Sequence, residues 1–317
     1  MKQMFIGIMS LLSLVLAADD ALPDLYVPPT KAHTIDLRIT GSPEFALEAE
    51  QWRQVYTGLQ HEKSRVRFRV EAKGNTFAVP SVIEATAHLG MMSRELKAEE
   101  LAAYNKHFGA APVTLPVAYQ VYAVVVHPEN PIKSISLQEL DAIFSADRKR
   151  GHPKALTRWG DLGLEGEWAD KAITPCIHNS STAAYGYTKK HLLLRGNYSK
   201  RVAPMRPGMA VSRDRSAIAL VRAVHVGRSL KALAVSDTPG EDRVALTHKT
   251  VKSGAYPSVV HYFLLSPPKP DPATRDFLRF LYKHQGQQII KESWLYPLDK
   301  EQVQENLLRV EKLSVNG

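Results

Sequence analysis

With 317 residues, 44% of them hydrophobic, the chain can bury one large core or two medium ones. Lys and Arg outnumber Asp and Glu by 41 to 32, a formal charge of +9 that favours anionic partners without choosing among them. The single cysteine, Cys176, excludes an intramolecular disulfide, so the fold must depend on its own core.

The N-terminal residues predict export. Residues 1–3 are short and basic, and residues 4–16 form an apolar run that is too short and wrongly flanked for a membrane span. The small residues Ala17 and Ala18 stand at the expected cleavage position, before an acidic segment. We interpret residues 1–18 as a cleaved signal peptide rather than a stable anchor, and we expect a periplasmic or secreted protein.

Two strand–loop–helix units are predicted before residue 90. In the first, residues 34–40 alternate between polar and apolar side chains as a strand does. Ser42 and Pro43 then suit an N-cap and a first helical position. Residues 65–72 are the alternating strand of the second unit.

The loop of the second unit contains Asn75 and Thr76 directly after a glycine. A helical pattern follows it and extends through residues 82–89. We expect Pro80 in the first turn of this helix, where a missing N–H costs nothing.

The third unit begins with residues 173–177, a predicted strand in which Cys176 is a small buried hydrophobe rather than a reactive thiol. Hydroxyl and amide side chains fill residues 179–182, just before a predicted helix. They suit a helix cap, but they also suit an anion site, because first-turn N–H groups lack an intrahelical partner. The residues alone leave both interpretations open.

Repeated strand–helix units predict an α/β fold with mostly parallel sheets. In that architecture ligands bind outside the carboxyl ends of the strands, where loops and helix N-termini converge. The three hydroxyl-bearing loops are therefore a candidate oxyanion site.

The middle of the chain has a different character. Residues 112–131 are apolar, β-branched and crossed by prolines, which suits an extended connection between two lobes. A helix follows, with Ser136 as its N-cap and Leu140 and Phe144 on its apolar face. Residues 200–228 carry much of the basic excess; without interleaved aromatic residues they predict a solvated face, and we expect no nucleic-acid partner.

The motifs of common enzyme classes are absent from the sequence. It has no Gly-x-Ser-x-Gly elbow, no His-Glu-x-x-His helix, no phosphate loop with Gly-Lys-Ser/Thr and no Cys-based metal spacing. A Ser180 nucleophile served by His178 has no support from a separation of two residues. We therefore expect no catalytic residue, no metal ion and no cofactor.

Short motifs spread along the chain resemble the periplasmic phosphate-binding proteins of ABC transporters. The matching pieces are residues 89–96 with Ser93-Arg94, Val117-Ala118-Tyr119, Val124-Val125-Val126, Asn130-Pro131, Leu140 with Ile143-Phe144, Trp159-Gly160-Asp161-Leu162, Gly254-Ala255-Tyr256-Pro257, and residues 276–298. They stand in the family's order over residues 34–300.

The resemblance implies an α/β periplasmic binding protein fold of two lobes, each a mostly parallel sheet flanked by helices. The ligand cleft would lie between the lobes and close by hinge motion. Lobe one would combine residues 34–116 with 232–300, lobe two would be 117–231, and 301–317 would be a C-terminal tail. The implied function is a monomeric receptor that binds phosphate or a similar small oxyanion and presents it to an ABC permease.

The resemblance also implies ligand contacts at residue positions. They are Ser42, Asn75, Thr76, Ser93, Arg94, His178, Ser180, Ser181 and Thr182. Arg94 would supply positive charge, and we hypothesise that Ser180 and Thr182 face the cleft.

Two departures from the family pattern concern charge. Relatives carry Ser-Gly-Thr in the third loop with an arginine ahead of it, whereas this chain has Ser180-Ser181-Thr182 and no such arginine. His178 can replace that charge only in part, because imidazole is mostly neutral at pH 7. In the first loop, Glu44 would repel an anion unless it points away.

A second interpretation stays open beside the receptor. The chain can be a structural or signalling relative that kept the fold, lost the ligand and contacts an envelope protein. A charged partner in the pocket would favour the receptor, and the missing arginine favours the alternative.

Overall fold

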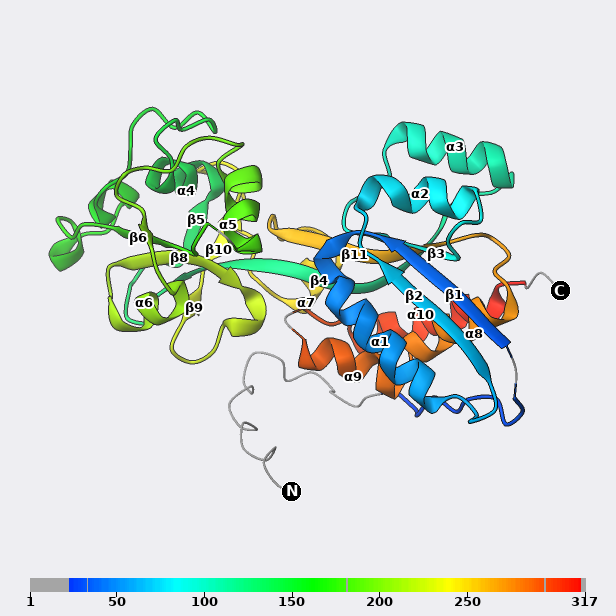
Figure 1. Cartoon of the computed structure of the whole chain (residues 1–317). Coiled ribbons are helices and arrows are strands. Elements are labelled where there is room, and N and C mark those ends of the chain that lie inside the picture. Colours follow the sequence, from blue (N-terminus) through cyan, green and yellow to red (C-terminus); the bar gives the residue numbers. More distant parts are fainter. Residues whose placement is uncertain (1–22, 33, 181, 294, 315–317) are drawn as a thin grey trace, which may run out of the picture. The chain divides into compact units, whose positions relative to one another are not determined.

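The computed structural model describes residues 23–32, 34–180, 182–293 and 295–314, which Figure 1 draws in colour. The predicted signal peptide, residues 1–18, and Ser181 lie outside the described residues. The described chain forms two compact units. Unit 1 is residues 122–258, and unit 2 is residues 23–121 with 259–314.

A long buried strand, β4 (Val113–Val126), carries the chain from unit 2 into unit 1. Its first part pairs with β11 (Val259–Ser266) in unit 2, and its last residues pair with β8 (Ala217–Arg222) in unit 1. All but three of its residues are buried, which explains why its sequence is a continuous apolar run rather than an alternating one.

The chain returns to unit 2 between residues 258 and 259, later than the expected boundary at 231 and 232. The difference arises from two short strands. β9 (Lys231–Ala232) pairs with β4, and β10 (Ala234–Ser236) pairs with β5 (Ser134–Ser136), so both belong to unit 1.

Unit 2 is built on a sheet with the strand order β2 (Arg65–Glu71), β1 (Thr34–Gly41), β3 (Leu89–Met92), β11 and β4. β1 pairs parallel with β2 and β3, and β11 is antiparallel to both of its neighbours. Alternate residues of β1, such as Leu37 and Ile39, are fully buried, as the sequence pattern predicts.

Helices cover both faces of the unit 2 sheet (Figure 1). They are the short 3₁₀ helix η1 (Pro43–Phe45), α1 (Ala46–Leu59), α2 (Asn75–Ile83), α3 (Ala98–Phe108), α8 (Pro272–Leu281), α9 (His284–Glu292) and α10 (Lys300–Lys312). α2 and α3 pack on β3 and β11 around Tyr104 and Phe263, and Trp52 of α1 donates a hydrogen bond to the carbonyl of Gly286 on α9. The predicted C-terminal tail thus includes most of α10.

Unit 1 contains a sheet in which the end of β4 is followed by β8, β6 (Thr174–Ile177) and β7 (Ala203–Pro204). Its helices are α4 (Leu137–Phe144), η2 (Trp159–Leu162), η3 (Gly166–Trp168), α5 (Ala183–Tyr187), the π-helical η4 (Thr188–Leu192), α6 (Pro207–Arg213), η5 (Ala223–His225) and α7 (His248–Lys252). β6 pairs parallel with β7 and β8, while β4 is antiparallel to β8. The strand pairs that involve β4 or β11 are antiparallel, and the other strand pairs are parallel.

Two of the predicted helix starts are confirmed. Ser42 caps η1 and accepts a hydrogen bond from the Glu44 N–H at 3.2 Å. Ser136 caps α4 and forms a capping box with Glu139.

The prediction for Pro80 is wrong. Because α2 begins at Asn75, Pro80 lies in the helix interior rather than in the first turn. The helix also ends at Ile83 and does not reach Leu89, which instead begins β3. Ala85 has a left-handed φ of 54°, which stops the helix although the apolar spacing continues.

Candidate functional site

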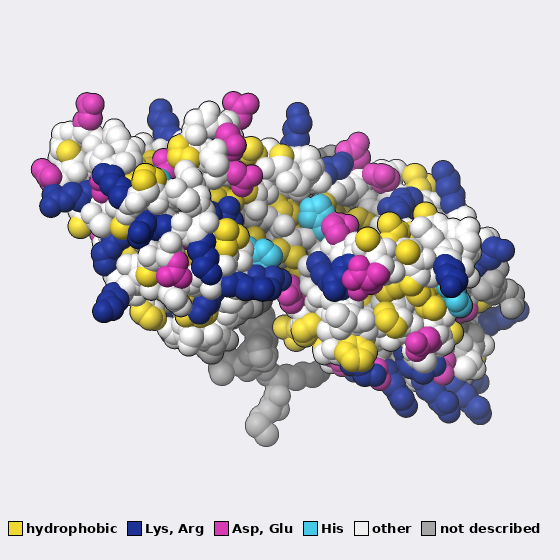
Figure 2. Space-filling view, turned by 90° about the horizontal axis from the view of Figure 1, so that it is seen from above, with side chains coloured by type: hydrophobic (Ala, Val, Ile, Leu, Met, Phe, Trp, Pro, Cys, Tyr) yellow, Lys and Arg dark blue, Asp and Glu magenta, His cyan; other side chains and the backbone are white. Residues whose placement is uncertain are grey.

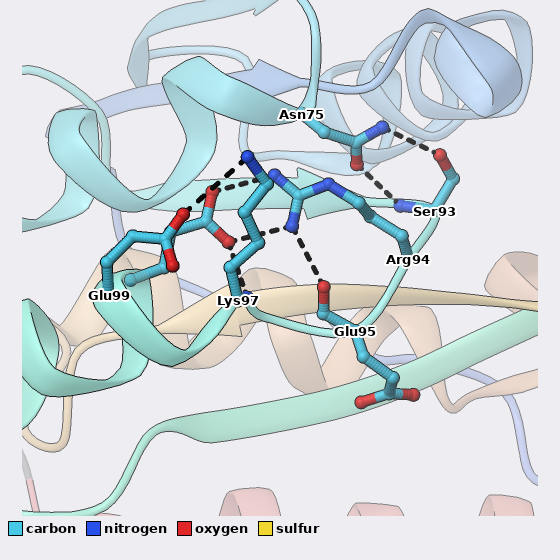
Figure 3. A network of polar contacts seen from close by, with 7 residues as sticks. Asn75, Ser93, Arg94, Glu95, Lys97 and Glu99 are labelled. Atoms are coloured by element: carbon cyan, nitrogen blue, oxygen red, sulfur yellow. Dashed lines mark hydrogen bonds and ion pairs between the residues drawn. The ribbon is translucent and has the colours of Figure 1, made fainter.

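Three loops of unit 2 meet in one hydrogen-bonded cluster, which we name the Ser42–Asn75–Ser93 cluster. Ser42 Oγ donates to Ser93 Oγ at 2.9 Å, and Asn75 Nδ2 donates to the same Ser93 oxygen at 3.0 Å. The Ser93 N–H in turn donates to Asn75 Oδ1 at 2.8 Å. Figure 3 shows the Asn75 side chain and Ser93 joined by this pair of contacts. The structure therefore brings together three of the predicted site residues.

Backbone geometry at Gly41 holds these loops together. Gly41 has φ +140°, and a Cβ there would lie 2.1 Å from the carbonyl oxygen of Met91. Only glycine fits such a close approach. The Ser42 N–H bonds to that Met91 carbonyl at 2.9 Å, and the Gly74 N–H bonds to the Gly41 carbonyl at 2.7 Å. The ends of β1 and β3 and the start of α2 are thus fixed relative to each other.

The cluster presents hydrogen-bond donors. Ser93 Oγ accepts two hydrogen bonds, so its own proton is directed toward a further acceptor. Asn75 and Thr76 open α2, whose first N–H groups have no intrahelical acceptor, and the N-cap, Gly74, has no side chain to satisfy them. A buried hydroxyl and a helix N-terminus side by side suit a small oxyanion.

Arg94 follows the cluster, but its charge is balanced within unit 2. Its guanidinium makes two bonds of 2.7 Å with the Glu100 carboxylate. A third bond, of 2.8 Å, joins it to the Glu95 carbonyl (Figure 3). Hydrogen bonding from Arg94 lowers the pKa of Glu100, which also accepts from the Lys97 N–H at the start of α3. Arg94 is held by its own loop and helix.

Glu44 has a partner that the sequence did not indicate. Its carboxylate accepts a hydrogen bond from the Tyr262 hydroxyl at 3.2 Å, and the ring of Phe45 stacks on Tyr262 with a centroid distance of 5.0 Å. The carboxylate, which we expected to repel an anion unless it pointed away, is therefore bound to a tyrosine of β11.

In unit 1, the loop after β6 is a helix cap. Thr182 Oγ1 accepts from the Tyr185 N–H at 3.2 Å and donates to the Asn179 carbonyl at 2.8 Å, so Thr182 is the N-cap of α5. Ser180 is exposed, His178 is half-buried, and Ser181 lies outside the described residues. The capping interpretation holds for Thr182, and a ligand role for Ser180 stays a prediction.

Sequence reasoning missed two side chains beside this loop, Arg222 and His225. β6 and β8 are parallel neighbours, so His178 after β6 and Arg222 at the end of β8 lie at the same sheet edge. Loss of hydration, His225 and Arg222 lower the pKa of His178; loss of hydration and Arg222 also lower that of His225. Arg222 and His225 belong to the basic segment that we assigned to a solvated face, and only the strand pairing indicates their position.

Cys176 is buried in β6, as predicted, and burial raises the pKa of its thiol to about 11.

Among the described residues there is no group of three or more His, Cys, Asp or Glu side chains placed to hold a metal ion. Of the described helices, none has the length and apolar character needed to cross a membrane. A depression of about 300 Å³ at the start of α8, beside Thr34, Arg275 and Arg279, includes none of the predicted site residues.

Two α/β units, each with polar side chains at the carboxyl ends of its strands, define a ligand-binding protein of the two-lobed type. A family model described as "PBP superfamily domain" matches residues 27–285. The phosphate-binding protein PstS of Pseudomonas aeruginosa is 34% identical over 297 residues, covering 90% of each chain. The chain therefore belongs to the PBP superfamily, in the family of periplasmic phosphate-binding proteins of ABC transporters.

Solved structures agree on the fold. A possible phosphate binding protein from Planctomyces limnophilus aligns with a TM-score of 0.65 at 20% identity, covering 89% of this chain and 100% of that one. An ABC-type phosphate transport receptor from Vibrio cholerae aligns with a TM-score of 0.60 at 18% identity, covering 82% and 99%. The predicted α/β two-lobed binding-protein fold is confirmed.

Proposed function

We propose that the chain is an exported receptor that binds phosphate or a similar small oxyanion and presents it to an ABC permease. The observation that carries the proposal is the Ser42–Asn75–Ser93 cluster, which sets a buried hydroxyl donor beside the first turn of α2. A relative of 34% identity that bears the name phosphate-binding protein supports the choice of ion.

Binding of this kind needs no chemical step. Hydroxyl, amide and backbone N–H donors replace the hydration shell of the anion, and each charge-assisted hydrogen bond contributes about 1.5–3 kcal/mol. The proposed contacts in unit 2 are Ser42, Asn75, Thr76 and Ser93, and the proposed contact in unit 1 is Ser180. The receptor has no catalytic residue and no cofactor in this proposal.

Location and assembly belong to the same proposal. Residues 1–18 have the pattern of a secretory signal peptide, which supports a periplasmic or secreted receptor. We propose that it acts as a monomer toward its permease. The alternative, a relative that has lost its ligand, is not favoured, because a relative of 34% identity over 90% of each chain bears the name phosphate-binding protein.

The test is calorimetric titration of the mature protein, unfolded and refolded to remove carried-over ligand, with phosphate, sulfate, molybdate and a phosphonate at low salt. We expect micromolar or tighter binding of phosphate. Ser93→Ala should weaken it by about 10-fold or more, because a buried donor to a charged group is lost. Ser212→Ala, on α6 in unit 1, is the matched control. Absence of binding heat with all four anions would overturn the proposal.

A further inference from the structure

The excess positive charge of the chain lies in one unit. Lys and Arg outnumber Asp and Glu by 21 to 12 in residues 122–258, against 19 to 18 in residues 23–121 with 259–314. Figure 2 shows Lys and Arg side chains scattered over the viewed face with acidic side chains among them. Net charge by itself does not define a site. A site requires that basic side chains of unit 1 lie together beside one loop.

The sheet of unit 1 brings three nitrogen-bearing side chains to one edge. β6 and β8 run parallel, with Cys176 opposite Ala219, so the chain leaves both strands at the same edge. His178 follows β6, Arg222 ends β8, and His225 ends η5 directly after it. Residues that are far apart in sequence are thus neighbours at the carboxyl ends of parallel strands, where α/β proteins bind ligands.

A second contact ties α5 to this edge. Tyr187 of α5 stacks on Tyr122 with a centroid distance of 4.0 Å and an interplanar angle of 21°. Tyr122 is the partner of Arg222 in the β4–β8 pairing. The helix that Thr182 caps therefore packs beside the strand end that carries Arg222, and α5 also contacts β8 directly.

Of these three side chains, the arginine is the one suited to pair with an anion. An arginine side chain is a fixed positive charge with five N–H donors, whereas a neutral imidazole offers one donor and one acceptor. Loss of hydration, and after it the charge of Arg222, lowers the pKa of His178 and His225, which favours their neutral form. The planar guanidinium of an arginine matches phosphate oxygens in pairs, and neutral imidazoles beside it can donate further hydrogen bonds to the anion.

We propose that Arg222, flanked by His178 and His225, binds the anion in unit 1 and supplies the positive charge that residues 178–182 lack. This inference rests on the proposed function, and it names the arginine that binds the anion in unit 1. The arginine that the family pattern places ahead of the third loop is absent from this chain. In this proposal Arg222, at the end of the neighbouring strand β8, takes its role.

The experiment compares phosphate titrations of the wild type with Arg222→Gln, Arg222→Lys and Arg228→Gln. Arg228→Gln removes an exposed charge from the same segment and is the control. We expect Arg222→Gln to weaken phosphate binding about 10- to 100-fold, Arg222→Lys to recover part of that loss, and the control to stay within about 2-fold. Thermal melts without ligand establish that each variant is folded.

The outcomes separate the two proposals. If the wild type binds phosphate and Arg222→Gln binds it equally well, the inference is overturned and the proposed function stands. A loss as large in Arg228→Gln as in Arg222→Gln would also overturn it, because general charge would then explain the effect. If the wild type binds none of the four anions, both the function and the inference fail.

Discussion

Asp161, in the turn of η2, accepts hydrogen bonds from the N–H groups of Thr157 and Arg158 at 2.9 and 3.0 Å and from Lys154 Nζ at 2.9 Å. These bonds hold the pKa of Asp161 at about 2, below the usual value near 4. Because the folded pKa is the lower one, the stabilisation is complete above pH 4 and is lost as pH falls from about 4 to about 2.

Replacing Asp161 by Asn should therefore destabilise unit 1 at neutral pH by about 2 kcal/mol and have little effect at pH 2. Urea unfolding of the wild type and Asp161→Asn at both pH values measures this. An equal loss at pH 7 and pH 2 would show that the carboxylate charge is not what stabilises the turn.

At the scale of elements, the loop before α5 contains a capping residue, Thr182, and a candidate ligand residue, Ser180. Thr182 makes both hydrogen bonds expected of an N-cap, whereas Ser180 is an exposed residue of the preceding turn. Thr182→Ala should cost about 1 kcal/mol of unfolding free energy, and Ser180→Ala should cost much less. If Ser180 binds the anion, its replacement should weaken phosphate binding without a change in melting temperature. Equal destabilisation by both substitutions would assign Ser180 to the cap.

Local sequence signals predicted the starts of elements well and their ends poorly. The caps at Ser42 and Ser136 were readable because an N-cap depends on residues within one turn. The end of α2 could not be predicted from local sequence. It depends on the left-handed backbone at Ala85 and on the pairing of β3, which begins at Leu89, between β1 and β11. Apolar spacing alone does not distinguish a continuing helix from a turn into a buried strand.

At the scale of the molecule, strand pairing decides what the sequence could not. The Ser42–Asn75–Ser93 cluster was predictable in its members from the family resemblance, but the contacts among them follow from β1 and β3 lying side by side. Arg222 was not predictable, since nothing near His178 in sequence points to it. Its position follows only from the pairing of β6 with β8.

Bound phosphate should protect from hydrogen exchange the segments whose groups donate to it. Phosphate at about 100 times its Kd stabilises the bound protein by about 2.7 kcal/mol, which slows amides that exchange only by full unfolding about 100-fold. We expect added phosphate to protect peptides that contain Ser42, Asn75 and Ser93 in unit 2, and peptides over residues 177–183 and 219–226 in unit 1. Exchange mass spectrometry with and without phosphate measures both sets.

The Ser93→Ala protein at the same phosphate concentration is the control, because weaker binding should reduce protection in both units together. Protection confined to unit 2 would mean that the Ser42–Asn75–Ser93 cluster binds the ion without the Arg222 edge. Protection confined to unit 1 would mean the reverse, and it would make the assembled hydroxyls of unit 2 structural.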